Sequence, residues 1–315
     1  MTSQNVSMSP ATFTAMIAVG PDPVELVRLR DLLTSLVHFE PTVSRILLID
    51  DSTEARDLSA SVPPLPATCR LEILPSERRG RGRALMGGGC LVMLTGLREA
   101  HRGGVGAFVL KFDTDALVVA PFSQKLIGVI AREPDAGIIG ACALSPTGKP
   151  RGDEYFRRVF GNFTRWRLPA SERKLAGRMR SFPTRLVHVK LLRLTRRARK
   201  TGCTLGENVQ GGAYAITAKA IDRMASAGYL DDVTVWLDTF ALEDGVLPLY
   251  ARMLGLKLVD YVGHHEVFGV VYRGLPASLD DIVERGYSIV HSIKNDERAT
   301  EEQVRDYFAR RRQTG

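Results

Sequence analysis

Short apolar runs alternate along this chain with segments whose apolar residues recur at helical spacing. FTAMIAV at 13–19 and RILLIDD at 45–51 have the length and the residue types of buried strands. Between them, over 24–39, leucines recur every three or four positions, as they do on one face of a helix. GPDP at 20–23 separates the first strand from this helix. The pattern predicts a strand–helix–strand unit at the start of the chain.

The same alternation continues towards the end of the chain. Further strands are expected at 70–74, 107–112, 137–143, 211–216 and 257–262, and a strand or loop at 287–290. Further helices are expected up to about residue 100 and over 122–132, 217–227 (capped by Thr217), 244–254 and 296–313. Strands that alternate with helices indicate βαβ units. The sequence therefore predicts an α/β fold with a mainly parallel, Rossmann-like sheet and helices on both faces.

Acidic residues follow two of the predicted strands. Asp50 and Asp51 end the second strand, and Asp113 and Asp115 follow the strand at 107–112. In parallel sheets, ligands gather beyond the carboxyl ends of the strands. We therefore expect both acidic pairs to face one crevice.

The net charge of +8 over 315 residues is unevenly distributed. Residues 151–200 hold 16 lysines and arginines against three acids, so this segment carries +13 and the remaining chain −5. It also contains interleaved aromatic residues, Phe156, Phe160, Phe163 and Trp166. Such a segment is typical of a solvated helical face, of nucleic-acid or phosphate binding, or of an amphipathic helix on anionic lipid. We expect a basic, partly helical insertion that interrupts the α/β alternation.

The remaining bulk features favour an intracellular protein. No stretch approaches 18 consecutive apolar residues, so a membrane-spanning helix is not expected, and the first residues lack the features of a secretory signal. Four scattered cysteines, Cys69, Cys90, Cys142 and Cys203, are expected to be free thiols in a reducing cytoplasm. The basic segment at 151–200 could also bring the protein into peripheral contact with the inner face of an anionic membrane.

The motif Asp113-Thr114-Asp115 places two carboxylates between apolar flanks, where burying charge is costly. One interpretation is a solvated turn in which an aspartate caps the backbone. The other is a divalent cation, Mn²⁺ or Mg²⁺, which two carboxylates on a strand-to-loop turn can hold while leaving positions for phosphate oxygens and water. The cation would remove the cost of the two charges.

A second constellation is LEDGVLPLYARMLGLKLVDY at 242–261. Its apolar residues predict one buried helix face, with Asp244 as N-cap so that Pro248 falls in the first turn, where amide hydrogens lack partners. Capping alone would explain Asp244 and its neighbour Glu243. A carboxylate at a helix mouth is equally suited to act as a general base.

The order of these parts resembles the GT-A-type glycosyltransferases, which use nucleotide-sugar donors. LLIDDS is followed by FDTDALV about 60 residues later, then by GGAYAIT at 211–217 and LEDG at 242–245. The nearest groups are inverting families with an ED motif, including β-1,3-galactosyltransferase-like enzymes. The resemblance spans roughly 13–295, apart from the basic insertion, and implies a GT-A fold with a UDP-sugar donor and a divalent metal.

The resemblance also implies roles for the acidic strand ends. Asp115 would ligate the metal directly, and Asp113 would face the metal or the ribose. Asp50 or Asp51 would meet the nucleobase or the ribose. The metal would offset charge on the departing diphosphate.

On the acceptor side, Gly211 and Gly212 would line the sugar and acceptor pocket, where missing side chains allow close approach. Asp244, beside Glu243, would deprotonate the acceptor hydroxyl. Because the insertion at 151–200 is basic, we also expect an acceptor that is anionic or linked to a lipid phosphate.

GT-A enzymes often add a histidine near the C-terminus to the metal site. His291 is preferred here, because Lys294 follows it and could contact the diphosphate, and His264 and His265 are the alternatives. The glycine- and arginine-rich loop at 78–83 lacks the P-loop pattern, but its Arg81 or Arg83 could approach the diphosphate. A solvated loop is the other interpretation.

The expected organisation is one catalytic domain with short flanks. Its parts are a disordered N-terminus at 1–12, a GT-A domain at 13–295 with a nucleotide-binding half (13–122) and an acceptor half (123–295), and a charged C-terminal helix or tail at 296–315. Two other functions are considered: a nucleotidyltransferase acting on a sugar phosphate, and a nucleic-acid-binding protein built on 151–200. The last would bind with steep salt dependence, but it explains neither the aspartates nor the ED helix, so a nucleic-acid partner is not expected.

Overall fold

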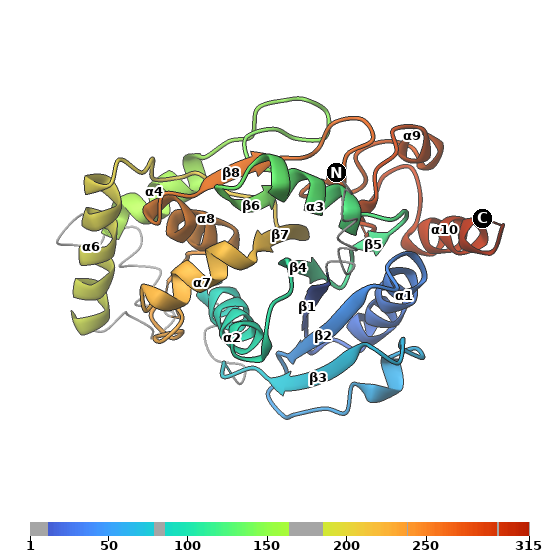
Figure 1. Ribbon diagram of the computed structural model, residues 1–315, viewed down its shortest axis with the longest axis horizontal. Helices are drawn as coiled ribbons and strands as arrows, with labels where there is room; N and C mark the ends of the chain where they lie inside the picture. The colour runs from blue at the N-terminus through green and yellow to red at the C-terminus, as the bar shows by residue number, and fades with distance from the viewer. Residues whose placement is uncertain (1–11, 79–85, 164–184, 238, 295, 315) are drawn as a thin grey trace, which may run out of the picture.

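The computed structural model describes residues 12–78, 86–163, 185–237, 239–294 and 296–314 (Figure 1). Within these residues a seven-stranded sheet has the order β3-β2-β1-β4-β7-β6-β8. Its strands are β1 Phe13–Val19, β2 Val43–Asp50, β3 Arg70–Pro75, β4 Phe108–Asp113, β6 Ala136–Gly140, β7 Ala213–Thr217 and β8 Lys257–Asp260. The strands lie where the apolar runs predict them.

The sheet is mainly parallel, as expected. β1 pairs in parallel with β2 and β4, β2 with β3, and β6 with β8. β7 lies between β4 and β6 and is antiparallel to both. The fold class is therefore α/β with one reversed strand in the middle of the sheet.

Helices cover both faces of the sheet, because their apolar stripes match its two apolar faces. α1 (Val24–Phe39) buries four leucines, and α3 (Ser123–Arg132) buries Leu126 and Val129, in one core. α2 (Gly87–Gly103), α7 (Ala218–Ser226) and α8 (Glu243–Met253) form the other core. The predicted cap of α7 is confirmed, since the Thr217 hydroxyl accepts the Ala220 N–H at 3.2 Å.

The basic insertion contributes two helices, α4 (Glu154–Phe163) and α6 (Arg185–Lys200). They contact each other, and α6 contacts α8. Phe156, Phe160 and Leu191 are buried in the same core as α2, α7 and α8. The insertion is thus packed onto one helical layer of the α/β fold (Figure 1).

A smaller sheet lies beside the first. Within the described residues it joins β5 (Leu117–Val118), β10 (Ile289–His291) and β9 (Phe268–Val270) in that order. β10 occupies the segment predicted as a strand or loop. β9 and the helix α9 (Leu279–Glu284) were not predicted, because three to six residues are too few to show a period.

The last helix is α10 (Glu301–Thr314), and a 3₁₀ turn, Ser59–Ser61, precedes the proline-rich segment at 62–66. The expected charged C-terminal helix is therefore present, and it buries Val304 and Phe308. Within the described residues no helix has both the length and the apolar content needed to cross a membrane. The expectations for 1–11, for Trp166 and for Arg81 and Arg83 fall outside the described residues.

Candidate active site

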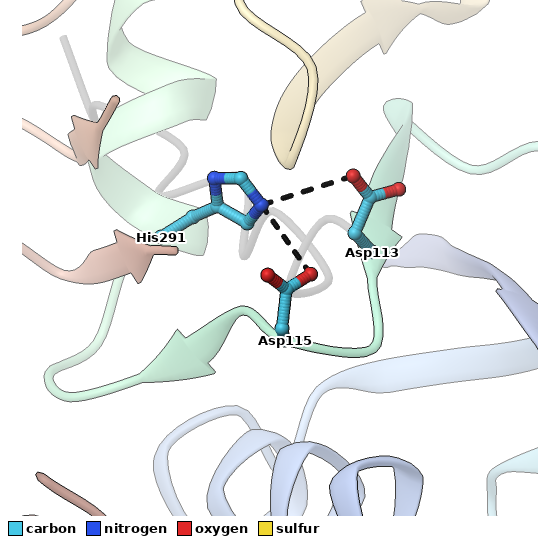
Figure 2. A group of neighbouring side chains, drawn as sticks. All are labelled: Asp113, Asp115 and His291. Carbon is cyan, nitrogen blue, oxygen red and sulfur yellow. Dashed lines mark ion pairs between the residues drawn. The ribbon is translucent and has the colours of Figure 1, made fainter. Parts of the chain in front are cut away.

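Asp113, Asp115 and His291 come together although 176 residues separate Asp115 from His291 along the chain (Figure 2). Asp113 is the last residue of β4, and His291 is the last residue of β10. His291 Nε2 lies 3.4 Å from Asp115 Oδ1 and 3.8 Å from Asp113 Oδ2. One ligand atom from each of the three residues lies within 4.8 Å of the others. Two carboxylate oxygens and an imidazole nitrogen are a donor set that divalent cations such as Mn²⁺ accept.

A backbone contact fixes the orientation of the His291 ring. Its Nδ1 lies 2.9 Å from the carbonyl oxygen of Val271. A carbonyl only accepts, so Nδ1 carries a proton, and Nε2 is the nitrogen that faces the two aspartates. Once Nε2 has no proton, its lone pair is available to a metal. This is the arrangement in which a histidine can ligate a metal.

The Asp115 carboxylate contacts three polar side chains. Its side chain is almost completely buried, and its Oδ2 accepts a hydrogen bond from Ser292 Oγ at 2.5 Å and lies 3.2 Å from Lys294 Nζ. Although burial opposes ionisation, His291, Ser292 and Lys294 hold the pKa of Asp115 well below its usual range. Asp115 is therefore an ionised, oriented carboxylate, as a metal ligand must be.

Asp113 has different partners. Lys111 Nζ donates to its Oδ1 at 2.6 Å, and the Gly212 N–H donates to its Oδ2 at 3.0 Å. Burial opposes ionisation of Asp113, but the charges of Lys111 and His291 lower its pKa. Lys111 was not among the predicted site residues. A single lysine inside the otherwise apolar run FVLKF was the signal in the sequence that could have indicated it.

The glycine pair enters the site just before β7. Gly212 has φ +82°, and a Cβ there would come within 2.4 Å of the His291 ring. A side chain at this position would therefore displace His291. Gly211 faces Asp244, whose Oδ2 would lie 3.7 Å from a Cβ on Gly211. Because neither glycine has a side chain, this segment can pass between His291 and Asp244.

Asp244 and Glu243 form the other end of the site. Lys111 Nζ lies 3.4 Å from Glu243 Oε1, so the buried lysine bridges Asp113 and Glu243. Asp244 Oδ1 is buried and has no hydrogen-bond partner among the described residues. Burial and the neighbouring charge of Glu243 raise the pKa of Asp244 well above its ordinary value. A carboxylate with a raised pKa and a free oxygen is suited to accept a proton.

Asp244 is not the N-cap, which corrects the sequence-based prediction. The helix begins at Glu243 with Leu242 as cap, so Asp244 lies in the first turn and Pro248 is the sixth helical residue. Pro248 has no N–H to offer the Asp244 carbonyl four residues earlier. That carbonyl instead accepts the N–H of Val209 at 2.9 Å. This hydrogen bond connects the loop before the two glycines to α8.

These groups line one open pocket of about 330 Å³. Asp113, Asp115 and His291 line one part of it, and Glu243 and Asp244 another. Polar residues that the sequence analysis did not select also line it: Gln210, Tyr272, Arg273 and Ser292. Arg273 and Lys294 add two cations to a pocket that is otherwise acidic.

The first acidic pair does not line this pocket. Asp50 is buried and accepts hydrogen bonds from Ser52 and Arg56, and Asp51 pairs with Arg78 at 2.8 Å. Both lie at the same edge of the sheet as Asp113, since β2 and β4 flank β1 in parallel. Their contact with a nucleotide stays a prediction.

The three histidines that were candidate metal ligands differ in their surroundings. His264 and His265 are exposed in the loop after β8, and among the described residues His291 is the histidine in the metal-ligand cluster. Lys294 Nζ lies 3.2 Å from Asp115 Oδ2, and its contact with a diphosphate stays a prediction.

No family model matches the chain, and no curated protein is similar to it. Among the solved structures that it resembles is a mannosyltransferase from Pyrobaculum calidifontis in complex with GDP-Man and Mn²⁺. The TM-score is 0.39 with 13% sequence identity, and the match covers 81% of this chain and 55% of that chain. This chain thus matches about half the length of the mannosyltransferase.

Proposed function

We propose that this protein is a metal-dependent glycosyltransferase that moves a sugar from a nucleotide donor, UDP in our prediction, to an acceptor hydroxyl with inversion. One observation carries the proposal. A three-ligand cluster, Asp113, Asp115 and His291, shares a pocket with a buried carboxylate, Asp244, that has an unpartnered oxygen. The order of the motifs along the chain, which resembles GT-A enzymes, supports the same reaction.

The cluster is proposed to hold Mn²⁺ or Mg²⁺ together with the donor diphosphate. A bound cation offsets negative charge on the diphosphate that leaves. Ser292 keeps Asp115 in place, and the Val271 carbonyl keeps Nε2 of His291 available. Lys294 and Arg273, at the same pocket, are proposed to contact the diphosphate oxygens.

At the other end, Asp244 is proposed as the general base. It takes the proton of the acceptor hydroxyl as that oxygen bonds to the anomeric carbon and the bond from this carbon to the phosphate oxygen breaks. Burial and Glu243 raise its pKa, which makes it a stronger base than an ordinary carboxylate. Gly211 and Gly212 leave room for the sugar beside it. Residues 13–122 are proposed as the nucleotide half of the domain and 123–295 as the acceptor half.

Two variants separate the proposed roles. Asp115→Ala is expected to lose Mn²⁺-dependent thermal stabilisation by a nucleoside diphosphate, because it removes a metal ligand. Asp244→Asn is expected to keep that stabilisation but to lose sugar transfer by about 10²–10⁴-fold, because it cannot accept the proton. Glu302→Gln, at an exposed position on α10, is the control.

A panel of UDP-, GDP- and other nucleotide sugars identifies the donor. Products are followed by phosphorus NMR and the anomeric configuration by proton NMR. Release of pyrophosphate instead of nucleoside diphosphate would indicate nucleotidyl transfer. Full metal-dependent activity in Asp115→Ala would disprove the metal assignment.

A further inference from the structure

The outer face of α6 carries a line of cations. Arg193, Arg196, Arg197 and Lys200 are exposed, and their spacing of three and four residues places them on one side of the helix. Leu191 and Ala198 are buried in the core, and Val187 and Leu194 pack against it, half-buried. We call these four residues the α6 cationic stripe. Packing fixes its direction, so the stripe points away from the protein.

The α6 cationic stripe has no counter-charge within the described residues. α6 does form one ion pair, in which Lys190 Nζ lies 2.6 Å from Asp232 Oδ2. Among described residues no carboxylate pairs with the four stripe residues. Cations suit the last turn of a helix, which explains Arg197 and Lys200. Arg193 and Arg196 lie before that turn, and like charges three and four residues apart repel each other.

The helices of the insertion are anchored beside the catalytic carboxylates. Phe156 of α4 packs so tightly on Gly245 that a Cβ there would come within 2.2 Å of the ring. Gly245 follows Asp244 directly. Tyr155 Oη also donates to the carbonyl of Phe240 at 2.7 Å. The stripe is therefore fixed relative to the acceptor end of the pocket, and α6 lies at the opposite end of the molecule from α10 (Figure 1).

We propose that the α6 cationic stripe docks the protein on an anionic lipid bilayer. A line of cations on one helix matches a flat array of anionic headgroups, each cation adding electrostatic attraction. Phe156 and Phe160 are buried in the core, so these rings cannot form a stacking platform for single-stranded nucleic acid. Because the apolar side of α6 is also buried, the contact is electrostatic and does not involve insertion into the bilayer. This docking is independent of the proposed sugar transfer.

Co-sedimentation of the full chain with vesicles tests the docking. The protein is expected to bind vesicles of phosphatidylcholine mixed with phosphatidylglycerol, but not vesicles of phosphatidylcholine alone. Raising the salt to about 1 M, where the screening length is about 3 Å, is expected to release it. Inorganic phosphate at the same ionic strength is expected to release it no better than chloride, since the surface recognises an array of headgroups.

Two sets of substitutions localise the contact. Arg193→Gln, Arg196→Gln, Arg197→Gln and Lys200→Gln together are expected to lower the partition coefficient by about tenfold or more. The matched control removes four exposed cations elsewhere: Arg30→Gln, Arg132→Gln, Arg310→Gln and Arg311→Gln. Its binding is expected to stay within about twofold of the parent, because these residues lie on α1, α3 and α10 and not on α6.

A charge-conserving variant guards against a folding defect. Arg193→Lys, Arg196→Lys and Arg197→Lys together are expected to retain binding and to melt at the same temperature as the parent protein. Equal binding to neutral and anionic vesicles, or equal loss in the stripe and control variants, would overturn the proposal. Tighter binding to single-stranded nucleic acid than to anionic vesicles at the same salt would also overturn it.

Discussion

At the residue scale, two aspartates of one pocket have their pKa shifted in opposite directions. Asp115 is surrounded by His291, Ser292 and Lys294, which lower its pKa. Asp244 is buried beside Glu243, which raises its pKa. Such a divergence is how two carboxyl groups take different tasks in one site, one staying charged and the other exchanging a proton. This divergence supports the proposal that Asp115 binds the metal and Asp244 takes up the proton.

Gly212 gives a test of how tightly this site is built. Gly212→Ala is expected to lower the free energy of unfolding by roughly 1–3 kcal/mol more than the backbone strain alone, because its Cβ would overlap the His291 ring. It is also expected to weaken Mn²⁺ binding, since the ring must move. Denaturant unfolding and calorimetric Mn²⁺ titration measure the two effects.

Gly148→Ala is the matched control for Gly212→Ala. Gly148 has φ +75°, close to that of Gly212, but a Cβ there would meet nothing within 4 Å. It is expected to cost about 1 kcal/mol of backbone strain and to leave Mn²⁺ affinity unchanged. Equal losses of stability in the two variants would show that the His291 ring is not confined by Gly212.

At the element scale, the site depends on where strands and helices end, and only some of those ends are visible in the sequence. The aspartates follow long apolar runs, so their place at the ends of β2 and β4 could be predicted. The partners of His291 could not, because β9 and β10 have three residues each and pair through tertiary contacts. The N-cap of α8 was predicted two residues too late, at Asp244, since Leu242, which cannot cap through its side chain, occupies the N-cap position.

Lys111 joins β4 to α8 from inside the protein. Burial opposes its protonation, but Asp113 and Glu243 raise its pKa above the ordinary value, so it stays charged. Lys111→Met is expected to lower the free energy of unfolding by about 3–5 kcal/mol, because it leaves two carboxylates without their cation. Denaturant unfolding at neutral pH measures the loss.

Lys219→Met provides the comparison for Lys111→Met. Lys219 pairs with Asp135 at 2.8 Å on the surface, and both side chains are exposed by more than a third. Removing this exposed pair is expected to cost about 0–1 kcal/mol. If Lys111→Met costs no more than Lys219→Met, the buried bridge between β4 and α8 does not stabilise the fold.

At the scale of the whole molecule, charged contacts join the two ends of the chain. Arg28 of α1 donates from Nε and Nη2 to both carboxylate oxygens of Glu301 on α10, at 2.8 and 2.7 Å. Arg305 donates to the same carboxylate and also contacts Asp31. The sequence suggested a charged surface helix, but charge patterns alone do not specify which helix lies opposite. The network shows why 296–314 is held against the first helix.

The same network predicts a pH dependence of stability. The hydrogen bond and charge of Arg28, together with Arg305, lower the pKa of Glu301 to about 2. A carboxyl group whose pKa is lowered by folding stabilises the fold above its unfolded pKa, about 4.3, and loses that contribution as the pH falls towards 2. The contribution at neutral pH is expected to be roughly 1–2 kcal/mol for this partly exposed group.

Glu301→Gln tests this contribution against Glu302→Gln. The unfolding free energy of Glu301→Gln is expected to be lower than that of the parent at pH 6, and the difference is expected to shrink as the pH falls to about 3. Glu302 is exposed on the same turn and should show no such change. A constant difference between Glu301→Gln and the parent from pH 6 to pH 3 would contradict the assignment.

The reversed direction of β7 has an electrostatic consequence for the pocket. Thr217, where β7 ends and α7 begins, lies level with Phe108 at the start of β4, on the edge of the sheet away from Asp113. The positive end of the α7 dipole therefore lies at the edge away from the pocket, whereas a helix that follows a parallel strand begins, with its positive end, at the pocket edge. An anion in this pocket thus gains no field from α7. Lys294 and Arg273, which line the pocket, can balance its charge, together with the cation that we propose.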